Sequence, residues 1–156
     1  MDFSSVFEYR DGVLYWKVDR RSNKVKGKPA GAIASDGRLK VGVGGKQYLV
    51  HRIIYELHYG HCTETIDHID GNPLNNRIEN LRAATPSQNA INSKARSGTK
   101  SGVRGVAWHE RDKLWHVRLR VDGAQKSFGY FKDLTEAANV AESVRNKHHG
   151  AFARHV

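Results

Sequence analysis

Four polar residues, Asp67, His68, Asn80 and Asn89, form the part of this sequence best suited to chemistry. A carboxylate, an imidazole and two carboxamides can together hold one divalent cation against a phosphodiester and place a general base beside it. Oxygen ligands of this kind suit Mg²⁺, and an imidazole can take up a proton near neutral pH. The chemistry requires side chains from three segments to converge, so the chain between them should be compact.

The elements around these residues are predicted as a strand, a loop and a second strand. Residues 66–68 and 80–82 have the pattern of strands, and residues 70–79, rich in Asn and Gly, that of the loop between them. An Asp–His pair alone is most often an ordinary turn. It indicates a site here only because Asn80 and Asn89 follow it in order.

A helix is predicted directly after the second strand. Thr85 suits the N-cap, Pro86 suits the first helical position, and Gln88 completes a capping box. Asn89 should therefore lie in the first or second turn of this helix, and the backbone should hold it toward the strands.

These residues resemble the HNH nuclease motif, or ββα-metal fold, over about residues 50–93. The resemblance is to the variant in which Asn replaces the last His, which many bacteriophage homing endonucleases carry. It implies that Asp67 and Asn89 bind the metal, that His68 is the general base, and that Asn80 holds the His68 loop through hydrogen bonds.

Two protein oxygens, from Asp67 and the Asn89 side chain, would leave most of an octahedral shell open, which fits Mg²⁺ as the cofactor, and we expect Mn²⁺ to substitute. Some HNH enzymes add a structural zinc held by paired cysteines, but this chain has one cysteine, Cys62, so we expect neither that zinc nor a disulfide within the chain. No apolar run is long enough to span a membrane, and the N-terminus lacks the features of a signal peptide. We expect a cytoplasmic protein, in the host cell if a phage encodes it.

The charge of the chain indicates a polyanionic partner. The formal net charge is +10 and the isoelectric point is about 9.9. Residues 61–93 contain two basic and four acidic residues. The flanks are basic, because residues 1–60 contain eleven basic and six acidic residues and residues 94–126 contain nine basic and three acidic residues. Basic flanks can neutralise phosphates while the weakly acidic middle attracts a cation.

The N-terminal section, residues 1–50, is predicted to be rich in β-hairpins. Asp-Gly at residues 11–12 and Gly-Gly at residues 44–45 are hairpin turn signals. A short helix over residues 51–59 should follow and end at Gly60.

A basic loop joins the two predicted hairpins and contains Arg20, Arg21 and Lys24. It can be a solvated loop or a contact for DNA phosphates. The overall charge favours the phosphate contact.

From residue 103 onward the pattern changes to three strands and one helix. The strands are predicted at residues 103–108, 114–121 and 125–131, and the helix at residues 134–149 with Gly150 as its stop.

The second of these strands alternates in polarity. Its apolar side is Trp115, Val117, Leu119 and Val121, and its polar side is His116, Arg118, Arg120 and Asp122. The apolar side should pack on the helix and the arginines should meet DNA. A plain surface strand with outward charges would alternate in the same way.

This segment resembles the plant APETALA/ethylene-response-factor DNA-binding domain over about residues 100–152. The matching landmarks are Val103-Arg104-Gly105-Val106, Trp115, Phe128-Gly129-Tyr130-Phe131 and Glu136-Ala137-Ala138. The resemblance implies a sheet in the major groove, with contacts from Arg104, Arg118, Arg120, Gln125 and Ser127. The chain departs from that family at three positions. An Arg of the first strand is Ala107 here, and an Arg and a Trp of the third strand are Gln125 and Ser127. The target sequence of the plant domains is therefore not expected for this chain.

The predicted fold class is α+β. We expect a β-rich section at residues 1–50, an HNH core at 51–93, a basic linker at 94–102 and a DNA-binding domain at 103–156, with a three-stranded antiparallel sheet packed on one helix.

The expected function is metal-dependent hydrolysis of duplex DNA by a homing-type endonuclease. A monomer should nick, and a pair should cut both strands. The alternatives are a DNA-binding regulator that has lost activity, and an RNA-directed nuclease, which is disfavoured because the arginine-bearing sheet is expected to lack exposed aromatic side chains.

Overall fold

The computed structural model describes residues 2–21, 23–92 and 99–153, which fall into two compact units, Met1–Pro86 and Ser87–Val156. The first residues of the expected linker, 94–98, lie outside the described residues.

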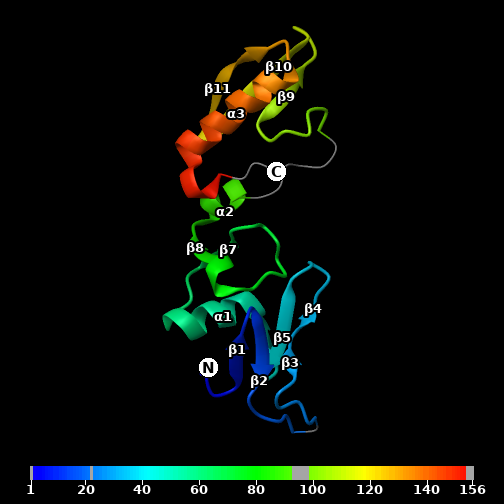
Figure 1. Ribbon diagram of the computed structural model, residues 1–156, viewed down its shortest axis with the longest axis vertical. Coiled ribbons are helices and arrows are strands. Elements are labelled where there is room, and N and C mark those ends of the chain that lie inside the picture. Colours follow the sequence, from blue (N-terminus) through cyan, green and yellow to red (C-terminus); the bar gives the residue numbers. More distant parts are fainter. Residues whose placement is uncertain (1, 22, 93–98, 154–156) are drawn as a thin grey trace. The chain divides into compact units, whose positions relative to one another are not determined.

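The first unit begins with two small antiparallel sheets (Figure 1). One contains β1 (Phe7–Arg10), β2 (Val13–Trp16) and β3 (Pro29–Ala30), and the other contains β4 (Ala32–Ile33), β5 (Leu39–Val43) and β6 (Lys46–Leu49). Both expected hairpins are confirmed. Their turn residues have positive φ, at 45° and 87° for Asp11 and Gly12, which matches the twist of the paired strands.

Helix α1 (Val50–Tyr59) follows directly and ends at Gly60, as predicted. Gly60 adopts φ 74° and its N–H bonds to the Glu56 carbonyl, the usual left-handed helix end. One face of α1 buries Ile53 and Ile54 completely in the core of the unit. That core also contains Phe3, Phe7, Leu14, Trp16, Val41, Ile66 and Leu81, so the hairpins and the motif strands share it.

The motif lies on β7 (Thr65–His68) and β8 (Leu81–Ala84), an antiparallel pair. A short 3₁₀ turn, Ile78–Asn80, leads into β8, so Asn80 ends the turn rather than starting the strand. Helix α2 (Pro86–Asn92) begins at the residue predicted from the capping pattern.

The second unit contains β9 (Val106–His109), β10 (Leu114–Val121) and β11 (Ala124–Phe131) in the order β11-β10-β9. Helix α3 (Leu134–His149) packs on one face of this sheet (Figure 1). Asp133 caps α3 by accepting from the Glu136 N–H at 2.9 Å. The α+β fold class is confirmed.

The first strand of this sheet is shorter than predicted, because it begins at Val106 rather than at residue 103. Gly105 adopts φ 85°, and a Cβ placed there would lie 2.9 Å from the Leu119 side chain. The glycine turns the chain at a close approach, so Arg104 lies before the strand and not on it.

Within the described residues, no helix is both long enough and apolar enough to cross a membrane.

Candidate active site

Strand β7 places Asp67 and His68 next to each other, and both are buried, with 4% and 8% of their surface exposed. Neighbouring side chains of a strand leave opposite faces. Asp67 pairs with Arg82 on β8, and His68 pairs with Leu81. The two motif residues therefore have different neighbours.

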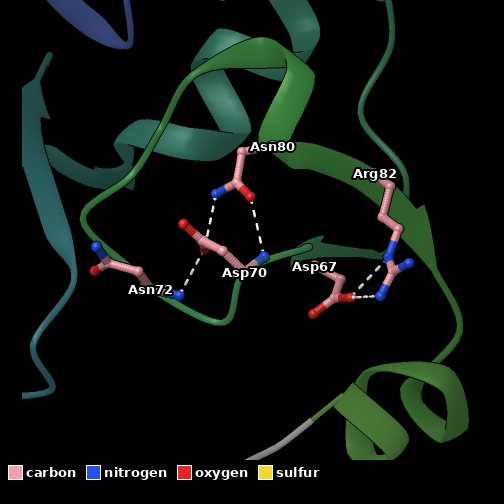
Figure 2. Close-up of polar contacts among 5 residues, drawn as sticks. All are labelled: Asp67, Asp70, Asn72, Asn80 and Arg82. Carbon is pink, nitrogen blue, oxygen red and sulfur yellow. Dashed lines mark hydrogen bonds and ion pairs between the residues drawn. The ribbon is translucent and has the colours of Figure 1, made fainter. Parts of the chain in front are cut away.

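Asp67 forms an ion pair with Arg82 (Figure 2). The Arg82 Nε and Nη2 donate to the same carboxylate oxygen, Oδ2, at 2.9 and 2.7 Å. Both side chains are largely buried, at 16% and 5% exposed for Arg82 and Asp67. A buried carboxylate needs a compensating charge, and Arg82 supplies it.

The His68 ring contacts two buried side chains. Its Nε2 lies 2.9 Å from Oδ1 of Asn76. The ring of His51 on α1 lies edge-on to it, with the ring centroids 5.0 Å apart. These contacts fix the plane of the imidazole.

Burial lowers the pKa of His51 to about 3, with smaller contributions from His68, Arg38 and Arg52. His51 is 6% exposed, so its ring is neutral at neutral pH. A neutral His51 ring places no positive charge next to the His68 ring.

We expect acidification from pH 7.5 to pH 5 to lower the opening free energy of α1 by about 1–2 kcal/mol more in the wild type than in His51→Gln. The unfolded chain protonates His51 below its ordinary pKa of 6.5, whereas the folded ring stays neutral down to about 3, so this contribution to stability falls with pH across that window. Hydrogen exchange of the α1 amides measures it. Equal losses of opening free energy in the wild type and in His51→Gln would contradict a buried and neutral His51 ring.

Asn80 joins the two ends of the motif loop (Figure 2). Its Nδ2 donates to Oδ1 of Asp70 at 2.9 Å and to the Asn75 carbonyl at 2.8 Å. Its Oδ1 accepts from the Asp70 N–H at 3.0 Å, and its backbone carbonyl accepts from the Ile69 N–H at 2.9 Å. These bonds hold the segment that follows His68.

Asp70 accepts hydrogen bonds from several residues of the motif loop, as Asn80 donates and accepts them. Its carboxylate accepts from the Asn72 N–H and from the Asn75 Nδ2, both at 2.7 Å. Burial opposes any lowering of its pKa, but the hydrogen bonds from Asn72, Asn75 and Asn80 outweigh burial and lower the pKa of Asp70. An ionised Asp70 therefore ties the loop together.

The β1–β2 hairpin supports this loop from the N-terminal section. The Tyr9 hydroxyl accepts from the Ile78 N–H at 3.0 Å. A Cβ at Gly12 would lie 3.0 Å from both Cγ and the backbone N of Arg77. The turn thus approaches the motif loop so closely that only glycine fits at this position.

Asn89 lies on α2 in the second unit, with its side chain half-buried. Asp67, His68 and Asn80 lie together in the first unit, the first two on β7 and Asn80 at the end of the 3₁₀ turn that leads into β8. The structure therefore brings three of the four motif residues into one strand–loop–strand segment.

The expected DNA-contacting residues lie mainly on the sheet of the second unit. Arg118 pairs with Ser127 and Arg120 with Gln125, and all four are exposed. The alternation of β10 is confirmed, because Val117, Leu119 and Val121 are buried on the side of α3.

Arg104 is half-buried and its Nη2 donates to the Ala90 carbonyl at 2.6 Å. In the first unit, Arg20, Arg21 and Lys24 are exposed in the loop after β2, and the Arg20 guanidinium lies 5.3 Å from the centre of the Trp16 ring.

The arginine-bearing sheet does present an exposed aromatic side chain, contrary to expectation. Tyr130 is 47% exposed and stacks on His116 with the ring centroids 4.1 Å apart. His116 precedes Arg118 on the same side of β10. The expected lack of aromatic side chains is therefore wrong and does not count against single-stranded substrates.

Three side chains of the site were not identified from the sequence: His51, Asn76 and Arg82. Arg82 could have been found, since antiparallel pairing of residues 66–68 with the second strand places it opposite Asp67. His51 and Asn76 carry no local signal, because only the tertiary fold brings them to His68.

The family model for HNH endonucleases matches residues 48–91. Protein 3.8 of Escherichia phage T7 is 39% identical over 89 residues, covering 57% of this chain and 73% of that protein. An uncharacterized HNH endonuclease, L560, of Acanthamoeba polyphaga mimivirus is 50% identical over 66 residues, covering 40% of this chain and 34% of that protein. The chain thus spans about a third of the mimivirus protein.

Among solved structures, the HNH homing endonuclease I-HmuI, described for DNA binding and cleavage, has a TM-score of 0.44 and 24% identity, covering 79% of this chain and 71% of that one.

Proposed function

This chain belongs to the HNH endonuclease family, hydrolases acting on phosphodiester bonds, and from that premise we propose that it is a metal-dependent, homing-type endonuclease of duplex DNA. The observation that carries the proposal is the strand–loop–strand segment of residues 65–84, in which the buried side chains of Asp67 and His68 lie on β7 and Asn80 holds the loop that follows them. The excess of basic residues in both flanks supports DNA as the substrate.

Asp67 and Asn89 are the residues that would hold the metal. A carboxylate and a carboxamide are hard oxygen donors, which fit Mg²⁺ and also Mn²⁺. Arg82 donates from Nε and Nη2 to Oδ2 of Asp67, so metal and guanidinium would share one carboxylate. When bound, the ion would polarise the scissile phosphate and stabilise the departing oxygen.

His68 is the proposed general base. Its ring is held by Asn76 and His51, so it can receive the proton of the attacking water without reorienting. Asn80 acts through the loop, because its hydrogen bonds to Asp70 and Asn75 fix the segment that follows His68.

Supercoiled plasmid incubated with the protein tests the proposal. We expect nicked circles in Mg²⁺ or Mn²⁺, none in EDTA, and none with Asp67→Asn. The variant should still retard DNA in a gel, since it leaves the basic surfaces intact. A wild type that retards DNA but leaves plasmid closed in both metals would favour the alternative, a regulator without catalytic activity.

One metal and one base act on one strand, so we propose that a monomer nicks and that a double-strand break requires pairing. Linear product that rises with the square of protein concentration would indicate the paired form.

The second unit is proposed to read DNA in the manner of the APETALA/ethylene-response-factor domain, through Arg118, Arg120, Gln125, Ser127 and Arg104. The support is the exposed row formed by Arg118 with Ser127 and Arg120 with Gln125. The basic loop with Arg20, Arg21 and Lys24 is proposed as an added phosphate contact, and the functional segments are proposed at residues 1–50, 51–93, 94–102 and 103–156.

We expect Arg118→Ala with Arg120→Ala to weaken DNA binding by about 10–100-fold, since each arginine contributes a phosphate or base contact. Cleavage at low salt should fall less than sequence preference does. Gel-shift titrations at several salt concentrations measure this, with a shallower salt dependence expected in the variant. Arg111→Ala is the matched control, because Arg111 is 91% exposed outside the sheet strands. Equal effects in both variants would contradict the assignment.

A further inference from the structure

Asn76 is the most deeply buried polar residue of the motif loop, with 1% of its surface exposed. Its Oδ1 lies 2.9 Å from Nε2 of His68, which is itself buried. Its Nδ2 is also buried, and has no hydrogen-bond partner within the part of the chain that the structure describes. Asn76 therefore directs its one satisfied side-chain atom at the ring of His68.

The chemistry of this contact decides where the ring proton lies. A carboxamide oxygen only accepts hydrogen bonds, so the 2.9 Å contact requires a proton on Nε2. In a neutral imidazole the other nitrogen, Nδ1, then carries the lone pair. We infer that Asn76 is a positioning residue that holds His68 in the Nε2–H tautomer and so makes Nδ1 the basic atom. This inference rests on the proposed function of His68.

The proton path follows from this tautomer. The attacking water gives its proton to Nδ1, and the resulting imidazolium keeps its Nε2–H on the Asn76 oxygen. The hydrogen bond becomes charge-assisted at that moment and so strengthens as the reaction proceeds. The ring does not have to turn.

The unpaired Nδ2 indicates that this asparagine serves the site rather than the stability of the fold. A buried donor without an acceptor costs free energy, and an apolar side chain of similar size would remove that cost. Stability alone would not select Asn at this position, whereas the Asn76 carboxamide supplies an oxygen that accepts from Nε2–H.

The loop framework holds Asn76 in place. The neighbouring Asn75 carbonyl accepts from Nδ2 of Asn80 at 2.8 Å, and the Asn76 N–H bonds to the Leu74 carbonyl at 3.2 Å. A Cβ at Gly12 would lie 3.3 Å from the Asn76 carbonyl carbon. Asn80 thus acts on His68 partly through Asn75 and Asn76.

Two variants of the full chain separate positioning from a merely structural role. Asn76→Leu removes the acceptor, and we expect single-turnover cleavage to fall on the order of 100-fold while the thermal midpoint stays within a few degrees. Asn76→Asp keeps an acceptor for Nε2–H, and its cleavage should stay within about tenfold of the wild type. Asn76→Leu cleaving at the wild-type rate would overturn the inference.

The tautomer itself is read by ¹⁵N NMR of histidine-labelled protein, with the His68 signals assigned from His68→Gln. We expect the proton-bearing nitrogen to be Nε2 in the wild type and in Asn76→Asp, whether or not Asn76→Leu folds. A proton on Nδ1 in the wild type would overturn the inference without touching the proposed function. A wild type that fails to cleave DNA would overturn the proposed function, while the NMR measurement still decides the tautomer.

Discussion

His68→Ala is expected to cleave DNA about 10³-fold more slowly than the wild type, the middle of the range for loss of a general base. The loss should appear in the single-turnover rate at saturating protein, because His68 is buried and removal of its ring should leave DNA affinity within about twofold. A quenched-flow or timed-quench plasmid assay measures the rate, and a gel shift measures the affinity.

His61→Ala is the matched control for His68→Ala, since His61 is an exposed histidine of the same unit. It should cleave at the wild-type rate. If both variants cleave equally well, His68 is not the base. If His68→Ala loses DNA affinity in proportion to rate, the residue contributes to binding rather than to the chemical step.

Arg82→Met is expected to destabilise the metal-free first unit by about 2–3 kcal/mol, because it removes the guanidinium that forms an ion pair with the buried carboxylate of Asp67. This expected loss of stability is smaller than the loss usual for a fully buried ion pair, because Arg82 is partly exposed. In EDTA, hydrogen exchange of the β7 and β8 amides measures the loss, which should be nearly absent in the double variant Asp67→Asn with Arg82→Met.

Addition of Mg²⁺ should recover part of the stability lost in Arg82→Met. A cation that binds only the folded state stabilises it by mass action, and removal of the guanidinium takes away a competing positive charge. Arg82→Met should therefore respond more strongly to Mg²⁺ than the wild type does. An identical response in both would mean that Asp67 does not bind the cation.

Local sequence signals predicted the elements of this fold well. The Asp-Gly and Gly-Gly turns, the Gly60 helix end and the alternation of β10 depend on interactions within a few residues, so their patterns are visible in the chain. The start of β9 was misjudged because Gly105 turns the chain where Leu119 leaves no room for a side chain. That constraint comes from a residue far along the sequence.

The candidate site was only partly visible from the sequence, for the same reason. Asp67, His68 and Asn80 follow a motif spacing, but their neighbours Asn76, His51 and Arg82 are set by burial and strand register. A loop rich in Asn looks solvent-exposed, yet the fold buries Asn76 at 1% exposure. Burial of this kind is a tertiary property and has no periodic signal.

The β1–β2 turn approaches Arg77 closely, and the Tyr9 hydroxyl accepts from the Ile78 N–H. These contacts determine which residues must be included when the nuclease segment is fused to another DNA-binding domain. A fragment that begins at residue 48, where the family match starts, would contain every motif side chain. It would lack Tyr9 and Gly12, whose contacts support the motif loop. Grafts onto other DNA readers should therefore take the chain from its first hairpin. Fusion proteins that begin after this hairpin would contain the catalytic side chains without the contacts that hold their loop in position.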